Sequence, residues 1–171
     1  MFFYIFIILV IFFLLFLLSM VWPPDSPWAP WWRTSKKTAR AMCKLAKVTK
    51  EDNVYDLGSG EGTALLIAAK EFGATGVGVE IDPLRFLFSK VLIKGNGLSN
   101  SVKIIRGNLF NQDISKASAI FVYLVPKTLE RLLPKFKKEL KKGTKIISYR
   151  YEMKLPLKEY DKENKIRLYI I

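Results

Sequence analysis

The apolar positions divide the chain into two unlike parts. Residues 1–22 hold no charged side chain, and residues 2–21 are an apolar and aromatic run interrupted by one serine. A helix of that length would measure about 30 Å, which is the thickness of the hydrocarbon core of a bilayer. The run is apolar on all sides, as contact with lipid requires. We therefore expect residues 1–22 to form one N-terminal transmembrane helix that anchors the rest of the chain.

A cleaved signal peptide is the competing interpretation of this run. It is disfavoured because no Lys or Arg precedes the run, the run is too long, and no A-x-A-like cleavage site follows it. Basic residues follow the run instead, at Arg33, Lys36 and Lys37. The positive-inside rule then predicts a single-pass protein of the cell membrane, with its N-terminus outside and the following domain in the cytoplasm.

Residues 23–34 are expected to be a juxtamembrane linker. The segment is rich in proline, which favours a stiff, extended spacer that holds the following domain near the membrane surface. Tryptophans are concentrated beside and within it, which is typical of an interfacial aromatic belt rather than of substrate clamps. The four tryptophans are Trp22, Trp28, Trp31 and Trp32.

Residues 35–171 alternate between helical and strand-like apolar patterns. Helices are predicted at 35–47, 62–72, 83–94 and 128–142. Strands are predicted at 53–57, 75–81, 102–106, 119–124 and 145–149, followed by a hairpin whose second strand is 165–171. The strand at 119–124 is almost continuously apolar, so we expect it to be buried on both faces. Alternation of this kind predicts an α/β fold, a Rossmann-like doubly wound and mostly parallel sheet.

Composition excludes several kinds of site. The chain has no histidine, which excludes triads that use His as the general base. Its single cysteine, Cys43, makes an internal disulfide impossible and a structural zinc site nearly so, and we expect no metal. Cys43 is expected to be a small core residue rather than a nucleophile.

The domain is strongly basic, with 28 Lys and Arg against 15 Asp and Glu in the whole chain. Residues 127–145 alone hold eight basic residues against two acidic ones. Three interpretations are open: a solvated helix face, attraction to anionic lipid, or RNA binding. Because an anchor is expected, the first two are favoured and nucleic acid is disfavoured as a partner.

The segment Asp56-Leu57-Gly58-Ser59-Gly60-Glu61-Gly62 is the most informative motif. It follows a predicted strand and begins a helix, where glycines allow a tight turn and close approach of a ligand to the backbone. The next strand ends at Glu80, 18 residues beyond Gly62. A carboxylate at that place can accept hydrogen bonds from both hydroxyls of a ribose, so the pattern predicts a cofactor that carries a nucleoside.

Residues 35–171 resemble a class I S-adenosylmethionine-dependent methyltransferase. The motif at 56–62 looks like the first motif of that family, and Glu80 looks like its ribose-binding acid. The segment 106–110 resembles the one that holds the adenine, with Asn108 where many members carry an acid. The resemblance implies S-adenosyl-L-methionine as cofactor, held by Asp56, Gly58, Ser59, Gly60, Gly62, Glu80, Ile81, Asn108 and Leu109.

The order of the motifs narrows the resemblance. Three further segments flank the first motif: Pro-Trp-Trp-Arg-Thr at 30–34, Tyr-Leu-Val-Pro at 123–126 and Ser-Tyr-Arg-Tyr at 148–151. Their order resembles that found in small membrane-anchored lysine methyltransferases related to the ATP synthase c-subunit lysine N-methyltransferase. Two departures are Arg33, where relatives have proline, and residues 154–158, where relatives have a Trp-containing segment. The resemblance implies methylation of a lysine in a membrane protein.

Two residues are the candidates for catalytic roles. We expect Tyr123, after the fourth strand, to position the methyl acceptor, and Thr34 to cover the methionine end of the cofactor. Two rival functions remain open, a methyltransferase for a lipid or small molecule and a non-catalytic module that only binds the cofactor. Methylation of adenine is disfavoured because residues 123–126 lack the Asn/Asp-Pro-Pro-aromatic motif.

Overall fold

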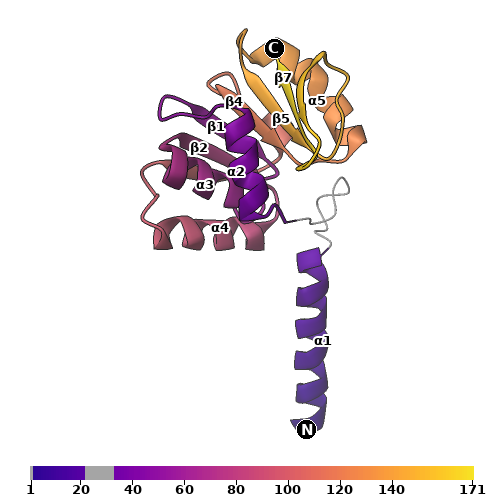
Figure 1. The fold of residues 1–171 in the computed structure, drawn as a ribbon. Coiled ribbons are helices and arrows are strands. Elements are labelled where there is room, and N and C mark those ends of the chain that lie inside the picture. Colours follow the sequence, from indigo (N-terminus) through magenta and orange to yellow (C-terminus); the bar gives the residue numbers. More distant parts are fainter. Residues whose placement is uncertain (1, 22–32) are drawn as a thin grey trace.

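A seven-stranded sheet forms the centre of the α/β domain in the computed structural model, which describes residues 2–21 and 33–171 (Figure 1). The strand order is β3-β2-β1-β4-β5-β7-β6, with β1 to β5 parallel and β7 antiparallel to its neighbours. The strands are β1 (Asn53–Leu57), β2 (Thr75–Glu80), β3 (Val102–Arg106), β4 (Ala119–Val122), β5 (Lys145–Tyr149), β6 (Leu157–Asp161) and β7 (Ile166–Ile170). The order turns at β1 and β4, so the carboxyl ends of these two strands open the crevice in which such sheets bind ligands.

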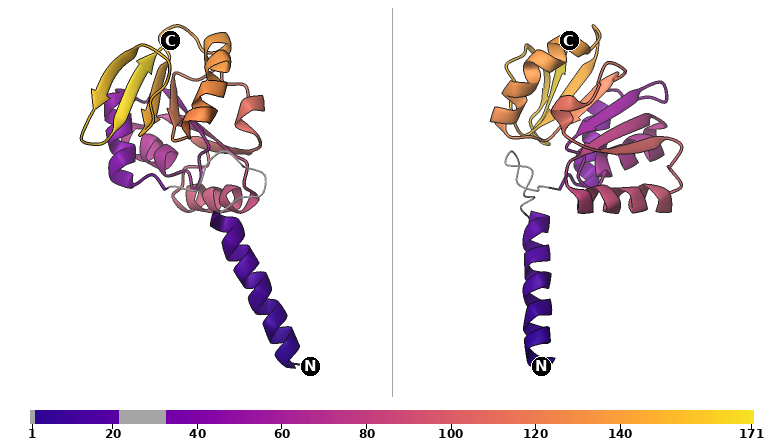
Figure 2. Two further views of the ribbon diagram at one scale, coloured as in Figure 1. Left: turned by 90° about the vertical axis from the view of Figure 1, so that its right-hand side faces the viewer. Right: turned by 180° about the vertical axis from the view of Figure 1, so that it is seen from behind.

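Helices cover both faces of the sheet (Figures 1 and 2). On one face lie α2 (Lys36–Leu45), α3 (Thr63–Phe72) and α4 (Pro83–Gly95), and on the other lies α5 (Pro126–Glu139). A short 3₁₀ turn, η1 (Leu109–Asn111), follows β3. The predicted doubly wound, mostly parallel sheet is therefore confirmed.

The core consists of two apolar layers, one on each side of the sheet. All four residues of β4 are fully buried, with Phe121 in one layer and Ile120 and Val122 in the other. This confirms the expectation drawn from the continuous apolar run. Cys43 is also fully buried, and burial raises the pKa of its thiol to about 12, as expected for a core residue rather than a nucleophile.

Most predicted elements differ from the observed ones only at their ends. Ser35 caps α2 by accepting a hydrogen bond from the backbone of Thr38, and Asp82 caps α4 by accepting one from Arg85. The largest difference is α5, which the pattern predicts at 128–142 and which spans Pro126–Glu139. Proline fits the first turn of a helix because its missing N–H needs no partner there. Pro134 lies inside α5 and neither begins nor ends it.

The N-terminal segment forms helix α1 (Phe2–Val21), drawn in indigo in Figure 1. Its large apolar side chains are exposed from residue 3 to residue 17. Among the helices of residues 2–21 and 33–171, none combines the length and the hydropathy that mark a membrane span. The expected transmembrane anchor is therefore not confirmed. The tryptophans and all but the last two residues of the predicted linker lie outside the described residues.

Candidate active site

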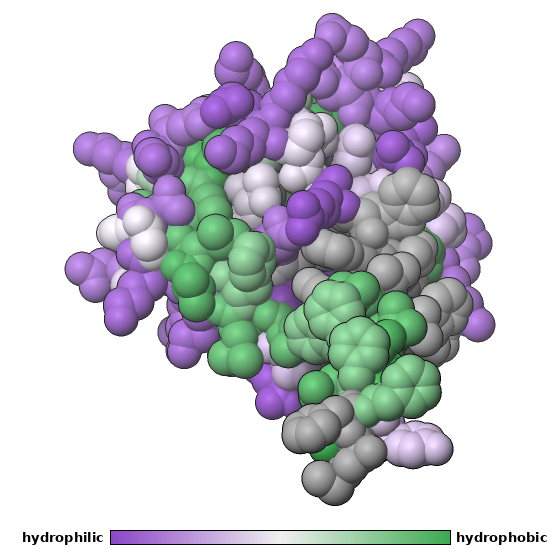
Figure 3. All heavy atoms as spheres, turned by 90° about the horizontal axis from the view of Figure 1, so that it is seen from below, coloured by the Kyte–Doolittle hydropathy of each residue, from purple (hydrophilic) through white to green (hydrophobic). Residues whose placement is uncertain are grey.

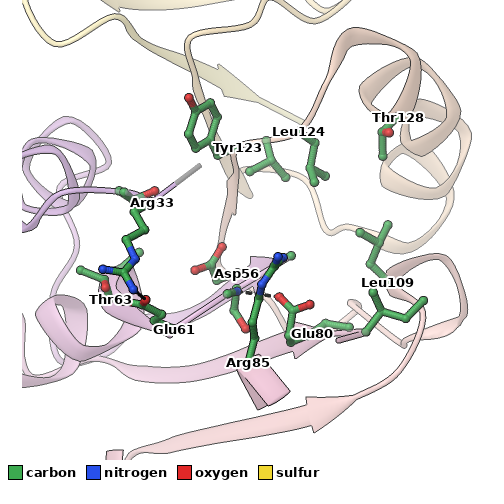
Figure 4. Close-up of a pocket in the computed structure, with 18 of the residues that line it drawn as sticks. Arg33, Asp56, Glu61, Thr63, Glu80, Arg85, Leu109, Tyr123, Leu124 and Thr128 are labelled. Carbon is green, nitrogen blue, oxygen red and sulfur yellow. Dashed lines mark hydrogen bonds and ion pairs between the residues drawn. The ribbon is translucent and has the colours of Figure 1, made fainter. Parts of the chain in front are cut away.

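A pocket opens where the loops after β1, β2, β3 and β4 meet (Figure 4). Ten of the eleven site residues predicted from the sequence line this pocket. These ten are Thr34, Asp56, Gly58, Ser59, Gly60, Glu80, Ile81, Asn108, Leu109 and Tyr123. The exception is Gly62, which lies behind the loop, at the start of α3. Residues from five separate segments thus converge on one site at the carboxyl edge of the sheet.

The glycine-rich loop has a backbone shape that glycine permits. Gly58, Gly60 and Gly62 all have positive φ, at 85°, 53° and 76°, in the left-handed region where a side chain is strained. The backbone N–H groups of Gly58 and Ser59 both donate to the carbonyl oxygen of Val79, at 2.9 and 3.0 Å. The loop is therefore fastened to the end of β2 and lies close against the neighbouring strand.

Gly78 in β2 makes that close approach possible. A Cβ atom there would lie 2.5 Å from Ile104 Cδ1, 2.7 Å from Ser59 Oγ and 2.9 Å from Leu65 Cδ1. Contacts below 3.0 Å require the neighbours to shift. The absence of a side chain at this position therefore helps to set the place of the cofactor loop, a role that the sequence motif did not indicate.

Glu80 lies at the end of β2 with its carboxylate held in place by two backbone groups. Its Oε2 accepts from the Gly60 N–H at 2.7 Å and its Oε1 accepts from the Asp82 N–H at 2.9 Å. The side chain is only 5% exposed, and burial raises its pKa although both hydrogen bonds act to lower it. Each carboxylate oxygen has two lone pairs, so each can accept one further hydrogen bond, from the hydroxyls of a ribose.

Asp56, at the end of β1, is buried beside Glu80. Burial raises the pKa of its carboxyl group to about 7, and the charge of Glu80 acts in the same direction. In Figure 4 both carboxyl groups face the same cavity. A ligand that carries positive charge would therefore stabilise the ionised form of this pair.

The segment after β3 forms an apolar wall with one polar group. Asn108 caps η1, and its Oδ1 accepts from the backbone N–H of Phe110 at 3.0 Å. That oxygen retains a second lone pair for an exocyclic amine, while its amide group can donate. Leu109 and Phe110 line the pocket beside it with half-buried apolar side chains. Such a wall fits a flat purine ring.

The pocket also holds a buried hydroxyl whose hydrogen-bond partner is missing among the described residues. Ser59 Oγ is buried and makes no hydrogen bond with them. Buried polar groups are nearly always paired, so this hydroxyl, which lies against Gly78 beneath the loop, is exceptional. The carboxylate pair and the apolar wall show that the residues present fit S-adenosylmethionine. No group of three or more metal-ligating side chains occurs among residues 2–21 and 33–171.

The chain enters the domain across the mouth of this pocket. Arg33 forms an ion pair with Glu61 of the glycine-rich loop, and Thr34 lines the pocket beside it. In the sequence, Arg33 stands out as a basic residue after the apolar run and as a departure from the pattern of relatives. Its contact with Glu61 joins two segments 28 residues apart, so no local pattern could have indicated it.

Aromatic side chains form the far side of the mouth, at the ends of β4 and β5. The Tyr123 ring meets the Tyr149 ring edge-on, with centroids 4.5 Å apart, and stacks on Tyr151 at 6.3 Å. The Arg150 guanidinium carbon lies 5.9 Å from the centre of the Tyr123 ring and 5.6 Å from that of Tyr149. Burial is the main cause that raises the pKa of the Tyr123 hydroxyl, so it is a neutral phenol at pH 7.

The turn that carries Arg150 is conformationally unusual. Arg150 has a positive φ of 67°, which is uncommon for a residue with a side chain. Its N–H donates to the Lys165 carbonyl at 2.8 Å, and its carbonyl accepts from the Arg167 guanidinium at 2.9 Å. The Ser148 hydroxyl donates to the Tyr151 carbonyl at 2.6 Å. Strained residues held in place by their surroundings are concentrated at functional sites.

Two further pocket residues were not predicted from the sequence. Arg85 lies in the first turn of α4 and Thr128 in the first turn of α5, and both are buried. Each follows a proline that begins its helix, so a helix start is visible in the pattern but the direction of these side chains is not. Figure 4 shows Arg85 close to Glu80 and Thr128 on the opposite wall.

Comparisons with known proteins agree with this site. The sequence profile of the ANTKMT methyltransferase domain matches residues 56–157. A protein-lysine N-methyltransferase of Saccharolobus islandicus is 40% identical over 75% of this chain and 80% of its own length. The ATP synthase c-subunit lysine N-methyltransferase of Caenorhabditis elegans is 27% identical over 72% of this chain, but the match spans only 62% of that protein.

A solved structure confirms the fold and the cofactor. An RNA methyltransferase from Salinibacter ruber, in complex with S-adenosyl-L-homocysteine, superposes with a TM-score of 0.80 and is 34% identical. The match covers 82% of this chain and 94% of that one. Fold and pocket therefore define a class I S-adenosylmethionine-dependent methyltransferase. Within that class, the chain belongs to the family of the ANTKMT methyltransferase domain.

Proposed function

We propose that this methyltransferase transfers the methyl group of S-adenosylmethionine to a lysine side chain of a membrane protein. The observation that carries the proposal is the aromatic mouth formed by Tyr123, Tyr149 and Tyr151 beside the cofactor pocket. The relatives named as lysine methyltransferases support the same acceptor. Because one of them is named for the c-subunit of ATP synthase, that membrane protein is the first candidate substrate.

The aromatic mouth suits the apolar stem and the charged head of a lysine. The faces of tyrosine rings attract an ammonium group, and their edges pack against its methylene groups. Tyr123 would position the acceptor, with Thr34 covering the methionine end of the cofactor from the other side of the pocket. Both residues line the pocket, although 89 positions of sequence separate them.

The acceptor must lose a proton before it can react, because the pKa of a lysine is about 10.4 in water. Desolvation in the mouth and repulsion by the Arg150 guanidinium, which lies beside Tyr123 and Tyr149, both lower the pKa of a lysine held there. They oppose the attraction of the ring faces for its ammonium group. The cofactor, when bound, supplies a methyl group on a sulfonium centre, and the pocket aligns the acceptor with it and excludes water.

Membrane association is the second part of the proposal. Helix α1 carries no charge, and its side chains from residue 3 to residue 17 are exposed rather than packed against the domain. Transfer of such a surface from water to lipid is strongly favourable. We assign residues 1–22 to a membrane anchor, 23–34 to a linker and 35–171 to the catalytic domain on the cytoplasmic side, where Lys36 and Lys37 follow the anchor.

RNA is a second candidate acceptor, favoured by one specific observation. The solved structure at 34% identity is described as an RNA methyltransferase. The exposed lysines of α5 would suit a phosphate backbone as well as a lipid surface. The absence of an Asn/Asp-Pro-Pro-aromatic motif after β4 argues against adenine as the methylated base.

A labelling experiment separates these acceptors. Full-length protein is incubated with native membranes, RNA and S-adenosylmethionine that carries a tritiated methyl group, and protein, lipid and RNA are then separated. We expect label in protein, recovered as methyl-lysine after acid hydrolysis, and none with the Glu80→Ala variant. Label in lipid or RNA would contradict the lysine proposal. Cofactor binding without any labelling would indicate a non-catalytic module.

A further inference from the structure

Helix α4 exposes a second apolar face that the fold does not use. Leu87, Phe88 and Val91 are 56%, 47% and 68% exposed, although all three are large apolar residues. They lie at i, i+1 and i+4, with partly buried Leu84 one turn earlier, so they form one stripe along the helix. Among the described residues after α1, only two other large apolar side chains are exposed to this degree, and these lie on the β6–β7 hairpin.

The inner face of α4 already satisfies its packing against the sheet. Arg85, Ser89 and Ile93 point inward, at i, i+4 and i+8, and the helix packs on β2 and β3. The exposed stripe lies on the opposite side of the helix. A surface helix of a water-soluble domain normally carries polar residues there. We therefore expect another apolar surface to cover this stripe.

The charged residues beside the stripe indicate what kind of surface covers it. Residues 83–95 contain no Asp or Glu, and the polar residues beside the stripe are Lys90 and Lys94, both exposed. Lys90 Nζ lies 5.4 Å from the centre of the Phe86 ring, so its stem runs along the apolar surface with the charge at the edge. Exposed apolar residues flanked by lysines, without acids, are typical of a helix that lies in the interface of an anionic bilayer.

The position of α4 supports the same occupant. It lies along the end of the domain that faces the uncharged helix α1 in Figure 1, and Figure 3, which looks at that end, shows an apolar patch there. The first turn of α4 also carries Arg85, which lines the pocket. A surface that held α4 would therefore hold the pocket mouth at a fixed height and angle.

We propose that α4 is a second membrane contact, which lies flat in the headgroup region of an anionic bilayer. Leu87, Phe88 and Val91 insert among the lipid chains, and Lys90 and Lys94 pair with anionic headgroups. The proposal rests on the membrane association proposed above. Its consequence is that the pocket faces the bilayer surface, where the lysine of a membrane protein emerges.

A fluorescence measurement on the full-length protein tests this contact. Val91→Cys is labelled with an environment-sensitive dye in vesicles of phosphatidylcholine and phosphatidylserine, with Lys137→Cys in α5 as the matched control; Cys43 is buried and protected from labelling. Lipids with a spin label on the acyl chain quench only dyes inside the bilayer. We expect strong quenching and a blue shift at position 91, and neither effect at position 137.

Two variants sharpen the test. Replacing Leu87 and Phe88 by Gln should abolish quenching at position 91, with the thermal unfolding temperature unchanged because both side chains are exposed. The double variant Lys90→Glu, Lys94→Glu should bind less tightly to vesicles that contain phosphatidylserine. The partition constant should fall by roughly fivefold for each lysine that is replaced.

Three outcomes would overturn the inference. If the protein floats with the vesicles but the dye at position 91 shows neither quenching nor a blue shift, this inference alone is overturned. Protein that does not float with vesicles contradicts the membrane proposal itself. A blue shift that depends on protein concentration without lipid would assign the stripe to a protein partner instead.

Discussion

The pocket has two halves that differ in how their residues are held. The cofactor half, built from the loops after β1 and β2, is buried and fastened by backbone hydrogen bonds, with Glu80 held by Gly60 and Asp82. The acceptor half, at the ends of β4 and β5, consists of half-buried rings around Tyr123 that touch by their edges and faces. The first half can hold one ligand in one geometry, and the second is the side at which we propose that the methyl acceptor binds.

This difference predicts a separation of kinetic effects. Substitutions in the cofactor half should change cofactor affinity or the stability of the fold. Substitutions in the acceptor half should change the rate of transfer while the cofactor still binds. A variant of one half with the effect expected of the other would show that the two halves act as one unit.

Removal of Glu80, the acid that we expect to bind the ribose, should have the largest effect. Glu80→Ala would delete the two charge-assisted hydrogen bonds expected to a ribose, each of which contributes about 1.5–3 kcal/mol. We expect the dissociation constant for S-adenosylmethionine, measured by calorimetry on the full-length protein in detergent, to rise by roughly a hundredfold or more. The exposed Glu51→Gln is the matched control and should leave it unchanged. Unaltered binding by Glu80→Ala would remove Glu80 from the site.

The buried Asp56 should make stability depend on pH. Burial raises its pKa from the ordinary value of 3.8 to about 7, so the folded state binds the proton more tightly than the unfolded state. Stability from this group is therefore complete below about pH 4 and is lost as pH rises to about 7, by at most roughly 4 kcal/mol. Urea unfolding at pH 5 and pH 8 measures the part of this loss that falls between those values, at most roughly 3 kcal/mol.

Asp56→Asn provides the comparison for that measurement. The amide does not ionise, so the variant should lose less stability than the natural protein between pH 5 and pH 8. Some loss should remain because burial also raises the pKa of Glu80. Identical pH dependence in the two proteins would show that Asp56 is not the titrating group.

The pair Gly78→Ala and Gly95→Ala should separate packing from helix propensity. A Cβ at Gly78 would meet three side chains at 2.5–2.9 Å, whereas a Cβ at Gly95 would meet nothing within 4 Å. We expect Gly78→Ala to lower the free energy of unfolding by about 1–3 kcal/mol and to weaken cofactor binding. Gly95→Ala should be neutral or slightly stabilising. Thermal unfolding measures the stability of the two variants and calorimetry measures their cofactor binding. Equal effects of the two substitutions would contradict this prediction.

Substitution of Tyr123 should change the activation free energy by the smallest amount. It should also separate most clearly the effects on methyl transfer from the effects on cofactor binding. We expect Tyr123→Ala to lower kcat/KM for the protein substrate about tenfold, or about 1.4 kcal/mol, with the cofactor dissociation constant within about twofold of the natural value. Tyr160→Ala is the control, because Tyr160 also packs against an arginine, at 4.2 Å, but lies on β6 away from the pocket. A parallel loss of cofactor affinity would place Tyr123 in the cofactor half instead.

The cofactor half and most of the fold can be predicted from the sequence. Strands and helices of residues 35–171 follow from the spacing of apolar residues, and the glycine-rich loop follows from a motif whose members are close in sequence. Positive φ values at Gly58, Gly60 and Gly62 and the capping by Ser35 and Asp82 are local properties. Local geometry repeats wherever the same residues occur, so it can be inferred before the fold is known.

The rest of the site depends on contacts between distant segments. Arg33 meets Glu61, Tyr123 meets Tyr149 and Tyr151, and Gly78 lies beneath Ser59, each across 19 or more residues of sequence. The outward face of α4 was equally hidden, because residues 83–95 are apolar on more than one side and only packing against β2 and β3 shows which side remains exposed. Such contacts are set by how the whole sheet is assembled, and this is why no local pattern contains them.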